Sequence, residues 1–180
     1  MKNGLKTREL VMCALFAALT AVCSQIQIPL PMVPINLALL AVVVAGGLLR
    51  PTAAALSQVV YVLMGLVGLP VFAGFSGGAA VLFGKTGGYI FGYILAAWLT
   101  AFLRTRLGGG YWKRCLFMAL SVLACYVFGT AWFMVITGMS LGLSLTYCVL
   151  PFLPGDAVKV LLGSFLVQRL ELPLKKALDA

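Results

Sequence analysis

The chain has 180 residues, of which 63% are hydrophobic and only 9% are charged, and its mean hydropathy is +1.11. Soluble domains carry about 25% charged residues, so this composition excludes an ordinary soluble protein and predicts an integral membrane protein. The length suits a single compact transmembrane domain over residues 1–180, with no room for a second, soluble domain.

Six apolar segments follow one another along the chain and are separated by short breaks. They predict an all-α membrane protein with six transmembrane helices, at Leu10–Ile28, Ile35–Leu49, Thr52–Leu69, Gly88–Leu103, Cys115–Thr137 and Gly155–Val167. The second and the sixth segments are short, because a span needs about 20 residues. Residues 138–154 are also apolar, but they include four Gly and Pro residues, so we interpret them as a buried outer loop and not as a seventh span.

The basic residues predict the topology. If the N-terminus is cytoplasmic, eleven of the thirteen lysines and arginines lie on the cytoplasmic side of a six-span protein: Lys2, Lys6, Arg8, Arg50, Arg104, Arg106, Lys113, Arg114, Arg169, Lys175 and Lys176. This asymmetry explains the net charge of +9 without a nucleic acid partner. No small-residue cleavage site follows the first basic residues, so we expect an uncleaved first span in the plasma membrane and two cytoplasmic termini.

Several kinds of chemistry are excluded or disfavoured. The chain has no histidine, and its five cysteines do not have the spacing of metal ligands. Asp156 has no paired carboxylate, which disfavours hydrolysis. The "GKT" at Gly84–Thr86 is no P-loop, because the motif requires glycine at position 79 and the chain has Ala79. We therefore expect no enzyme activity, no metal and no cofactor.

Three charged residues fall outside the cytoplasmic side: Lys85, Asp156 and Lys159. A charge within the membrane costs about 2.5–3.5 kcal/mol, so a residue that keeps one is a candidate for function. Asp156 and Lys159 are three residues apart and share one face of a helix, next to the free backbone N–H groups at its start. The alternative is an ion pair that only caps this helix, which leaves Lys85 unexplained.

Lys85 lies in the segment Gly68–Gly88, which contains seven glycines and no other charge. Irregular backbone at membrane depth is tolerated where protein buries it or where it lines a cavity. The segment therefore predicts a buried outer lid over a cavity, with three aromatic rings packing inward: Phe72, Phe75 and Phe83. A cavity that holds Lys85, Asp156 and Lys159 has a net charge of +1, which favours a small monoanion with a neutral hydrogen-bonding group.

Weaker candidates are polar residues near this cavity, and for each of them interface anchoring or helix packing explains the residue equally well: Gln25, Gln27, Asn36, Ser76, Tyr89 and Tyr93. In the first span, "ALFAALTA" places Ala14 and Ala18 four residues apart. Small residues at this spacing let another helix approach closely. Packing within this domain is the alternative, and the spacing alone favours it.

Three stretches together resemble the BioY family, the biotin-specific S-components of energy-coupling factor (ECF) vitamin transporters: "ALFAALTAV", "LMGLVGLPVFAGFSGGAAVLFGKTGGYIFGY" and "LPGDAVK". The resemblance implies six helices, a biotin site near the outer face, and coupling to a transmembrane subunit and two cytosolic ATPase subunits. It implies that Asp156 and Lys159 contact the ligand and that Ala14 and Ala18 form the docking face for the partner. The full expected set of substrate-binding residues is Asp156, Lys159, Lys85, Asn36, Phe75, Ser76 and Tyr89.

Two departures from the family pattern leave roles open. The chain has "NLA" from Asn36 where the family has a Thr-Leu-Gln segment. Whether Asn36 replaces a glutamine contact is therefore open. Position 85 is often proline or arginine in the family, which makes the role of Lys85 less secure. Other functions also stay open: an S-component for another small anionic vitamin, a small ion-coupled secondary transporter, or a structural membrane protein. A lone intramembrane carboxylate and the lack of a clear internal repeat disfavour the secondary transporter.

Overall fold

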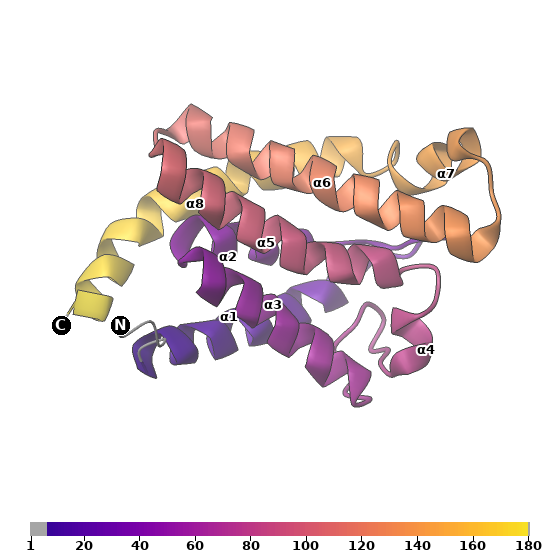
Figure 1. Cartoon of the computed structure of the whole chain (residues 1–180), viewed down its shortest axis with the longest axis horizontal. Helices are drawn as coiled ribbons and strands as arrows, with labels where there is room; N and C mark the ends of the chain where they lie inside the picture. The colour runs from indigo at the N-terminus through magenta and orange to yellow at the C-terminus, as the bar shows by residue number, and fades with distance from the viewer. Residues whose placement is uncertain (1–6, 180) are drawn as a thin grey trace.

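The computed structural model describes residues 7–179, and side chains as far as residue 174. The described residues form eight helices: α1 Thr7–Gln25, α2 Ala38–Leu48, α3 Pro51–Leu66, α4 Ala79–Leu82, α5 Gly87–Leu107, α6 Tyr111–Thr137, α7 Leu141–Cys148 and α8 Leu153–Asp179. Two short antiparallel strands, β1 (Gln27–Ile28) and β2 (Ile35–Asn36), pair between α1 and α2. The long helices lie side by side, with both termini at one end of the bundle and α4 and α7 at the other (Figure 1).

The predicted all-α membrane fold is confirmed, and the chain is a multi-pass membrane protein. Three described helices, α1, α5 and α6, are long and apolar enough to cross a membrane. The pair of α7 and α8, bent by 53°, is a fourth candidate, and α2 and α3 are apolar but shorter. The six long helices overlap the six predicted segments, while a count of six complete spans stays a prediction.

The interpretation of residues 138–154 as a buried loop is wrong. Its central part, Leu141–Cys148, is the helix α7, in which only Ser144 and Cys148 are buried. Gly142 lies inside this helix, where an added Cβ atom would meet nothing within 4 Å, so the glycine costs some backbone entropy but does not end the helix. Pro151 follows the end of α7, and Pro154 falls in the first turn of α8, where proline is tolerated because the first N–H groups have no helical partner.

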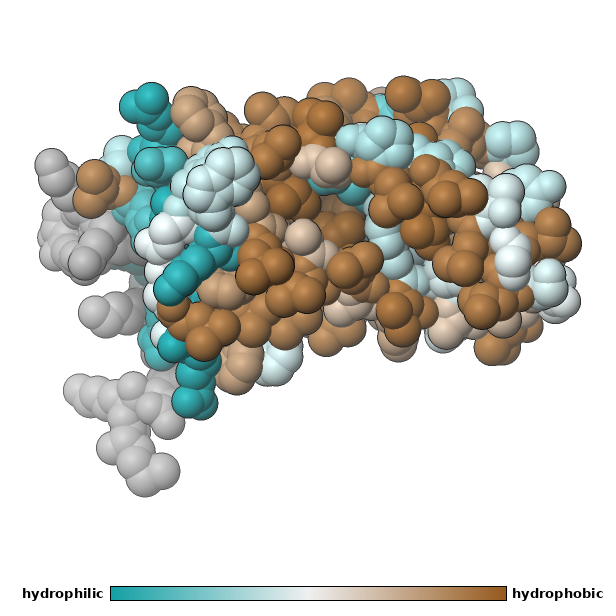
Figure 2. Space-filling model, turned by 90° about the horizontal axis from the view of Figure 1, so that it is seen from above, coloured by the Kyte–Doolittle hydropathy of each residue, from teal (hydrophilic) through white to brown (hydrophobic). Residues whose placement is uncertain are grey.

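Charged residues gather at one end of the bundle. Hydrophilic residues form a band beside the termini, and a broad hydrophobic surface begins directly beyond it (Figure 2). This distribution fits the predicted topology, in which that end faces the cytoplasm. Lys2 and Lys6, two of the eleven basic residues in that prediction, lie outside the described residues.

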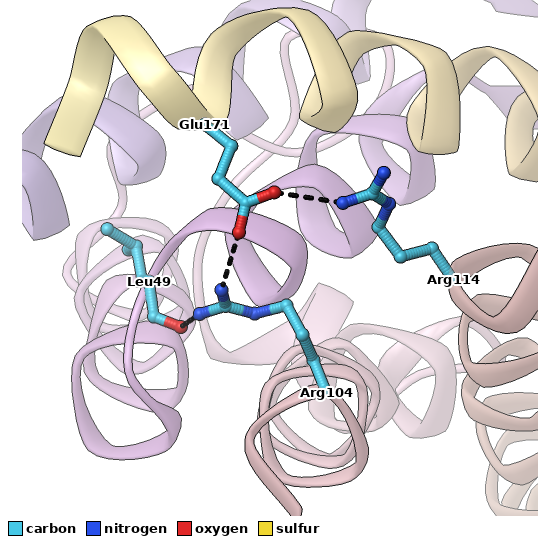
Figure 3. A network of polar contacts seen from close by, with 4 residues as sticks. All are labelled: Leu49, Arg104, Arg114 and Glu171. Atoms are coloured by element: carbon cyan, nitrogen blue, oxygen red, sulfur yellow. Dashed lines mark hydrogen bonds and ion pairs between the residues drawn. The ribbon is translucent and has the colours of Figure 1, made fainter. Parts of the chain in front are cut away.

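A partly buried polar network connects α8 to its neighbours at this charged end (Figure 3). Glu171 of α8 accepts from Arg114 of α6 at 2.9 Å and from Arg104 of α5 at 3.5 Å. Arg104 also donates to the carbonyl oxygen of Leu49, just after α2, at 3.0 Å. Three helices therefore meet at one carboxylate, and Arg104 connects them to the end of α2. Since α8 rises about 1.5 Å per residue, this anchor lies roughly 20 Å along the helix from Asp156.

Helices α5 and α6 approach closely because glycines face their neighbours. A Cβ atom at Gly129 would lie 2.3 Å from the Tyr89 ring, and one at Gly88 would lie 2.3 Å from Cβ of Trp132. Small residues permit this backbone approach between membrane helices. It brings the hydroxyl of Tyr89 within 2.9 Å of Thr130 Oγ1, so the packing of α5 on α6 sets the position of an aromatic ring in the site described next.

Candidate functional site

A cavity of about 200 Å³ lies between α2, α3, α5, α6, α8 and the segment that joins α3 to α5. One buried water needs roughly 10–15 Å³ of such space, so the cavity has room for a small organic molecule. Six aromatic side chains form much of its wall: Tyr61, Phe72, Tyr89, Tyr93, Tyr126 and Phe152. Apolar and aromatic walls with a few placed polar groups are typical of small-molecule sites.

Asp156 and Lys159 line this cavity from the first turns of α8. Lys159 Nζ lies 2.6 Å from Asp156 Oδ1, and the hydroxyl of Tyr126 donates to Asp156 Oδ2. The two side chains are almost fully buried, with 3% of Asp156 and 6% of Lys159 exposed. The ion pair considered as an alternative from the sequence is therefore present. It does more than cap α8, because both of its members face the cavity.

The pair has unused hydrogen-bonding capacity. A carboxylate accepts about four hydrogen bonds and an ammonium donates three. Among the described residues, the carboxylate of Asp156 has two donors, Lys159 and Tyr126, and the ammonium of Lys159 has one acceptor, Asp156. The site can therefore offer acceptors and donors to a ligand while the two charges neutralise each other.

Three more of the predicted residues line the same cavity: Asn36, Ser76 and Tyr89. The side-chain oxygen of Asn36 accepts from the N–H of Ala38 at 3.1 Å, which fixes Asn36 at the start of α2. Ser76 Oγ donates to the carbonyl oxygen of Ala73 at 2.8 Å. Predicted residues from β2, α5, α8 and the α3–α5 segment thus line one cavity.

Lys85 does not lie on the cavity wall, contrary to the prediction. Its side chain is exposed, and its Nζ lies 3.9 Å from Met32 Sδ. The next residue, Thr86, does line the cavity, so Lys85 lies beside it without entering it. The charges within the wall are one aspartate and one lysine. Their sum is zero, and the predicted net charge of +1 is wrong.

The expectation that three phenylalanines pack inward is correct only for Phe72, which is 1% exposed. Phe75 is 72% exposed and Phe83 is 62% exposed, and neither lines the cavity. Gly74 and Phe75 both have positive φ, +70° and +54°, and this turn directs the Phe75 side chain away from the protein. Phe83 follows the buried Leu82 at the end of α4 and lies on the opposite, outward side.

The predicted lid is not buried as a whole. Between Gly68 and Thr86, only Phe72 and Leu82 are buried. The backbone of this segment folds on itself instead, since Phe72 N donates to Ser76 O at 2.9 Å and Gly78 N donates to Gly65 O at 2.7 Å. These bonds satisfy polar groups that would otherwise need water or protein cover.

Two further tyrosines line the cavity: Tyr126, which was not predicted, and Tyr93, which was only a weak candidate. Tyr126 stands 30 positions before the aspartate that it contacts, inside an apolar span. Tyr93 reaches toward Asn36 Oδ1 at 3.5 Å. A tyrosine in an apolar helix is a useful signal only when its hydroxyl is known to face other polar groups, and this depends on how α5, α6 and α8 pack.

Ala14 and Ala18 are exposed on α1, whereas Cys13, Phe16 and Ala17 are buried against the rest of the domain. Packing within this domain therefore does not explain the two exposed alanines. A role in docking stays a prediction.

The sequence profile of the BioY family matches residues 1–176. A relative from Pyrococcus horikoshii, described as a probable biotin transporter BioY, is 35% identical over 167 residues, which cover 93% of this chain and 98% of that protein. A probable biotin transporter BioY from Bacillus subtilis is 32% identical over 167 residues, covering 90% and 89%. The crystal structure of an S-component for biotin from an ECF-type ABC transporter superposes with a TM-score of 0.86 at 30% identity, over 94% of each chain.

Proposed function

The chain belongs to the BioY family, and we propose that it captures biotin from the extracytoplasmic side and delivers it through an ATP-driven ECF transport complex. The similarity to an S-component for biotin over 94% of the chain supports this proposal. The ligand site is the cavity at the end of the bundle that lies away from the termini. We place this end outside the plasma membrane and both termini in the cytoplasm, as the basic residues favour.

The observation that carries the proposal is the buried Asp156–Lys159 pair facing an aromatic cavity. Biotin has a neutral ureido group with two N–H donors and one carbonyl acceptor. Asp156 accepts from the ureido N–H groups, and Lys159 donates to the ureido oxygen. Such a site favours the matching ligand strongly, because an analogue without these groups leaves buried polar atoms unpaired. The tyrosine and phenylalanine walls cover the fused rings.

The carboxylate of biotin lies toward the outer opening in this proposal. A neutral ion pair supplies no net charge to balance a second buried carboxylate, and burial of an unpaired charge is costly. Lys85 is exposed beside the cavity and offers a positive charge near water. We therefore assign Lys159 to the ureido group and Lys85 to the rim, where its contribution is small because solvent screens it.

Energy for uptake enters through partners. The sequence carries no P-loop, so we assign nucleotide hydrolysis to two cytosolic ATPase subunits and their connection to a transmembrane coupling subunit. The exposed Ala14 and Ala18 of α1 are the proposed contact with that subunit, because close helix approach needs small side chains.

Two measurements test this function. Protein purified from biotin-containing medium should carry biotin in a one-to-one ratio, detected by mass spectrometry after denaturation. Reconstituted with the coupling subunit and both ATPases, it should drive uptake of labelled biotin that depends on ATP. Purified protein that is empty, and that also fails to bind added biotin, contradicts the proposal.

A further inference from the structure

The C-terminal end of α1 holds the cavity wall in place from behind. Ser24 and Gln25, which we call the α1 latch, contact the loop of residues 71–76 through hydrogen bonds that span about 47–50 positions in sequence. Three residues of this loop line the cavity: Phe72, Ala73 and Ser76. Neither latch residue lines the cavity itself, so the latch acts on the site only through the loop.

Gln25 uses both ends of its side-chain amide on the loop. Its oxygen accepts from the backbone N–H of Phe75 at 2.8 Å, and its nitrogen donates to the backbone oxygen of Phe72 at 3.1 Å. Only an amide in this orientation satisfies both contacts, because its oxygen cannot donate and its nitrogen cannot accept. The hydroxyl of Ser24 lies 2.6 Å from the carbonyl oxygen of Val71, on the preceding residue of the loop.

The backbone that Gln25 holds is strained. Phe75 has φ of +54°, the only positive φ among the described residues other than glycine. A residue with a Cβ atom costs free energy in this region, and such a conformation persists only where the surroundings enforce it. The Phe75 ring cannot supply that enforcement, since it is 72% exposed. The hydrogen bond from the Phe75 N–H to Gln25 restrains this residue from outside the turn, and the hydrogen bond from Phe72 N to Ser76 O closes the turn around it.

The other side of the loop is held by packing. The Phe72 ring lies over Gly65, where an added Cβ atom would fall 1.9 Å from the ring, and meets Tyr61 edge-on at 5.5 Å. The loop is thus tied to the rest of the domain by one apolar anchor, Phe72, and one polar anchor, the α1 latch, while the hydrogen bond from Phe72 N to Ser76 O closes the turn within it. Loss of the polar anchor releases this turn from α1 while the apolar anchor remains.

We propose that the α1 latch is a positioning element that keeps the 71–76 loop closed against the cavity and thereby limits how fast small molecules enter and leave it. Where the molecule is biotin, this rests on the function proposed above. Breaking the latch raises both the association rate and the dissociation rate of the ligand, since an open wall permits entry and escape alike.

The reactivity of Cys125 reports directly on opening of the cavity, without any ligand. It lines the cavity and is 2% exposed, so a small maleimide modifies it only when the cavity opens. Cys115, also on α6 and buried, does not line the cavity and reports on general loosening of the fold. The experiment measures modification rates of both cysteines by peptide mass spectrometry in wild type, Gln25→Met and Gln168→Met. Gln168 is exposed on α8, so its substitution is the matched control.

The expected result is a roughly tenfold faster modification of Cys125 in Gln25→Met, since two hydrogen bonds are lost. The Cys115 rate and the Gln168→Met rates should match wild type. Gln25→Glu keeps the acceptor for Phe75 N–H and should fall between wild type and Gln25→Met; it also serves if Gln25→Met does not fold. The dissociation rate of labelled biotin should follow the Cys125 rates.

Equal modification rates of Cys125 in wild type and Gln25→Met would contradict the proposed latch. An increase of the Cys115 rate as large as that of Cys125 would also contradict it, because it indicates general destabilisation. Both outcomes are independent of the ligand. If wild type binds no biotin, the proposed function fails, while the modification rates still decide whether the latch closes the cavity.

Discussion

Lys159 Nζ and Asp156 Oδ1 lie 2.6 Å apart on adjacent turns of α8, and both side chains are buried in the wall of the cavity. A buried ion pair tolerates removal of both partners better than removal of one, because a single removal leaves an uncompensated charge. We therefore expect the pair to affect the stability of the empty protein as well as the proposed binding of the ligand.

Removal of one partner should destabilise the protein strongly. We expect Lys159→Met to lower the free energy of unfolding by about 3–5 kcal/mol. Asp156→Asn combined with Lys159→Met should recover part of this loss, because no buried charge remains. Unfolding of the detergent-solubilised variants measures both effects. Additive losses in the double variant would show that the two charges do not stabilise each other.

Tyr126 should control affinity through Asp156. Tyr126→Phe removes a hydrogen bond to a charged group, worth about 1.5–3 kcal/mol, and leaves the ring in place. If the hydroxyl holds the carboxylate in the orientation that accepts from the ligand, biotin affinity falls roughly ten- to hundredfold. Tyr147→Phe is the matched control, since Tyr147 lies on α7, is 44% exposed and does not line the cavity. Equal biotin affinities in the two variants would show that the Tyr126 hydroxyl does not contribute to binding.

The glycine contact between α5 and α6 should be necessary for the site. A Cβ atom at Gly129 would lie 2.3 Å from the Tyr89 ring, so Gly129→Ala forces the helices or the ring to move. Overpacking of this kind costs about 1–3 kcal/mol. We expect reduced thermal stability and weaker biotin binding. Gly142→Ala on α7 meets nothing within 4 Å and should be neutral or slightly stabilising. A Gly129→Ala variant with unchanged stability and binding would contradict the close packing.

The sequence predicts most helices because apolar runs of membrane length leave few alternatives. It predicts Asp156 and Lys159 as candidate site residues because buried charges are costly, and both line the cavity. It does not predict where α2 begins. Ile35 and Asn36, the first residues of the apolar run, pair with β1 instead. It also does not predict that α8 runs to Asp179, since polar residues continue a helix after it leaves the membrane.

The sequence also does not predict the side-chain directions in the segment between α3 and α5, for a different reason. The outward position of Phe75 follows from a positive φ, and a phenylalanine gives no sign of that conformation. The exclusion of Lys85 from the cavity depends on where the chain turns into α5. Tyr126 joins the site only because α6 and α8 pack together. Each of these facts is set by tertiary structure, which a charge or a glycine count does not specify.

The exposed face of α1 should be needed for transport but not for binding. Ala14→Trp with Ala18→Trp should leave biotin binding by the isolated protein nearly unchanged, because neither residue lines the cavity. The double variant should lose co-purification with the coupling subunit and ATP-driven uptake in proteoliposomes. Leu123→Trp with Val127→Trp is a matched control, since these residues are also four apart and exposed, on α6. Wild-type uptake by the α1 variant would place the docking face elsewhere, and lost binding would indicate packing within the domain.

The most direct test of the account is equilibrium binding by the purified chain, with wild type and Asp156→Asn titrated with biotin and with lipoic acid. Lipoic acid shares the valeryl carboxylate and a sulfur-containing ring with biotin but has no ureido group. The account predicts tight binding of biotin by wild type, little binding of lipoic acid, and a roughly ten- to hundredfold loss of biotin affinity in Asp156→Asn. Equal affinity of wild type for both ligands, or unchanged biotin affinity in Asp156→Asn, would contradict recognition of the ureido group by the Asp156–Lys159 pair.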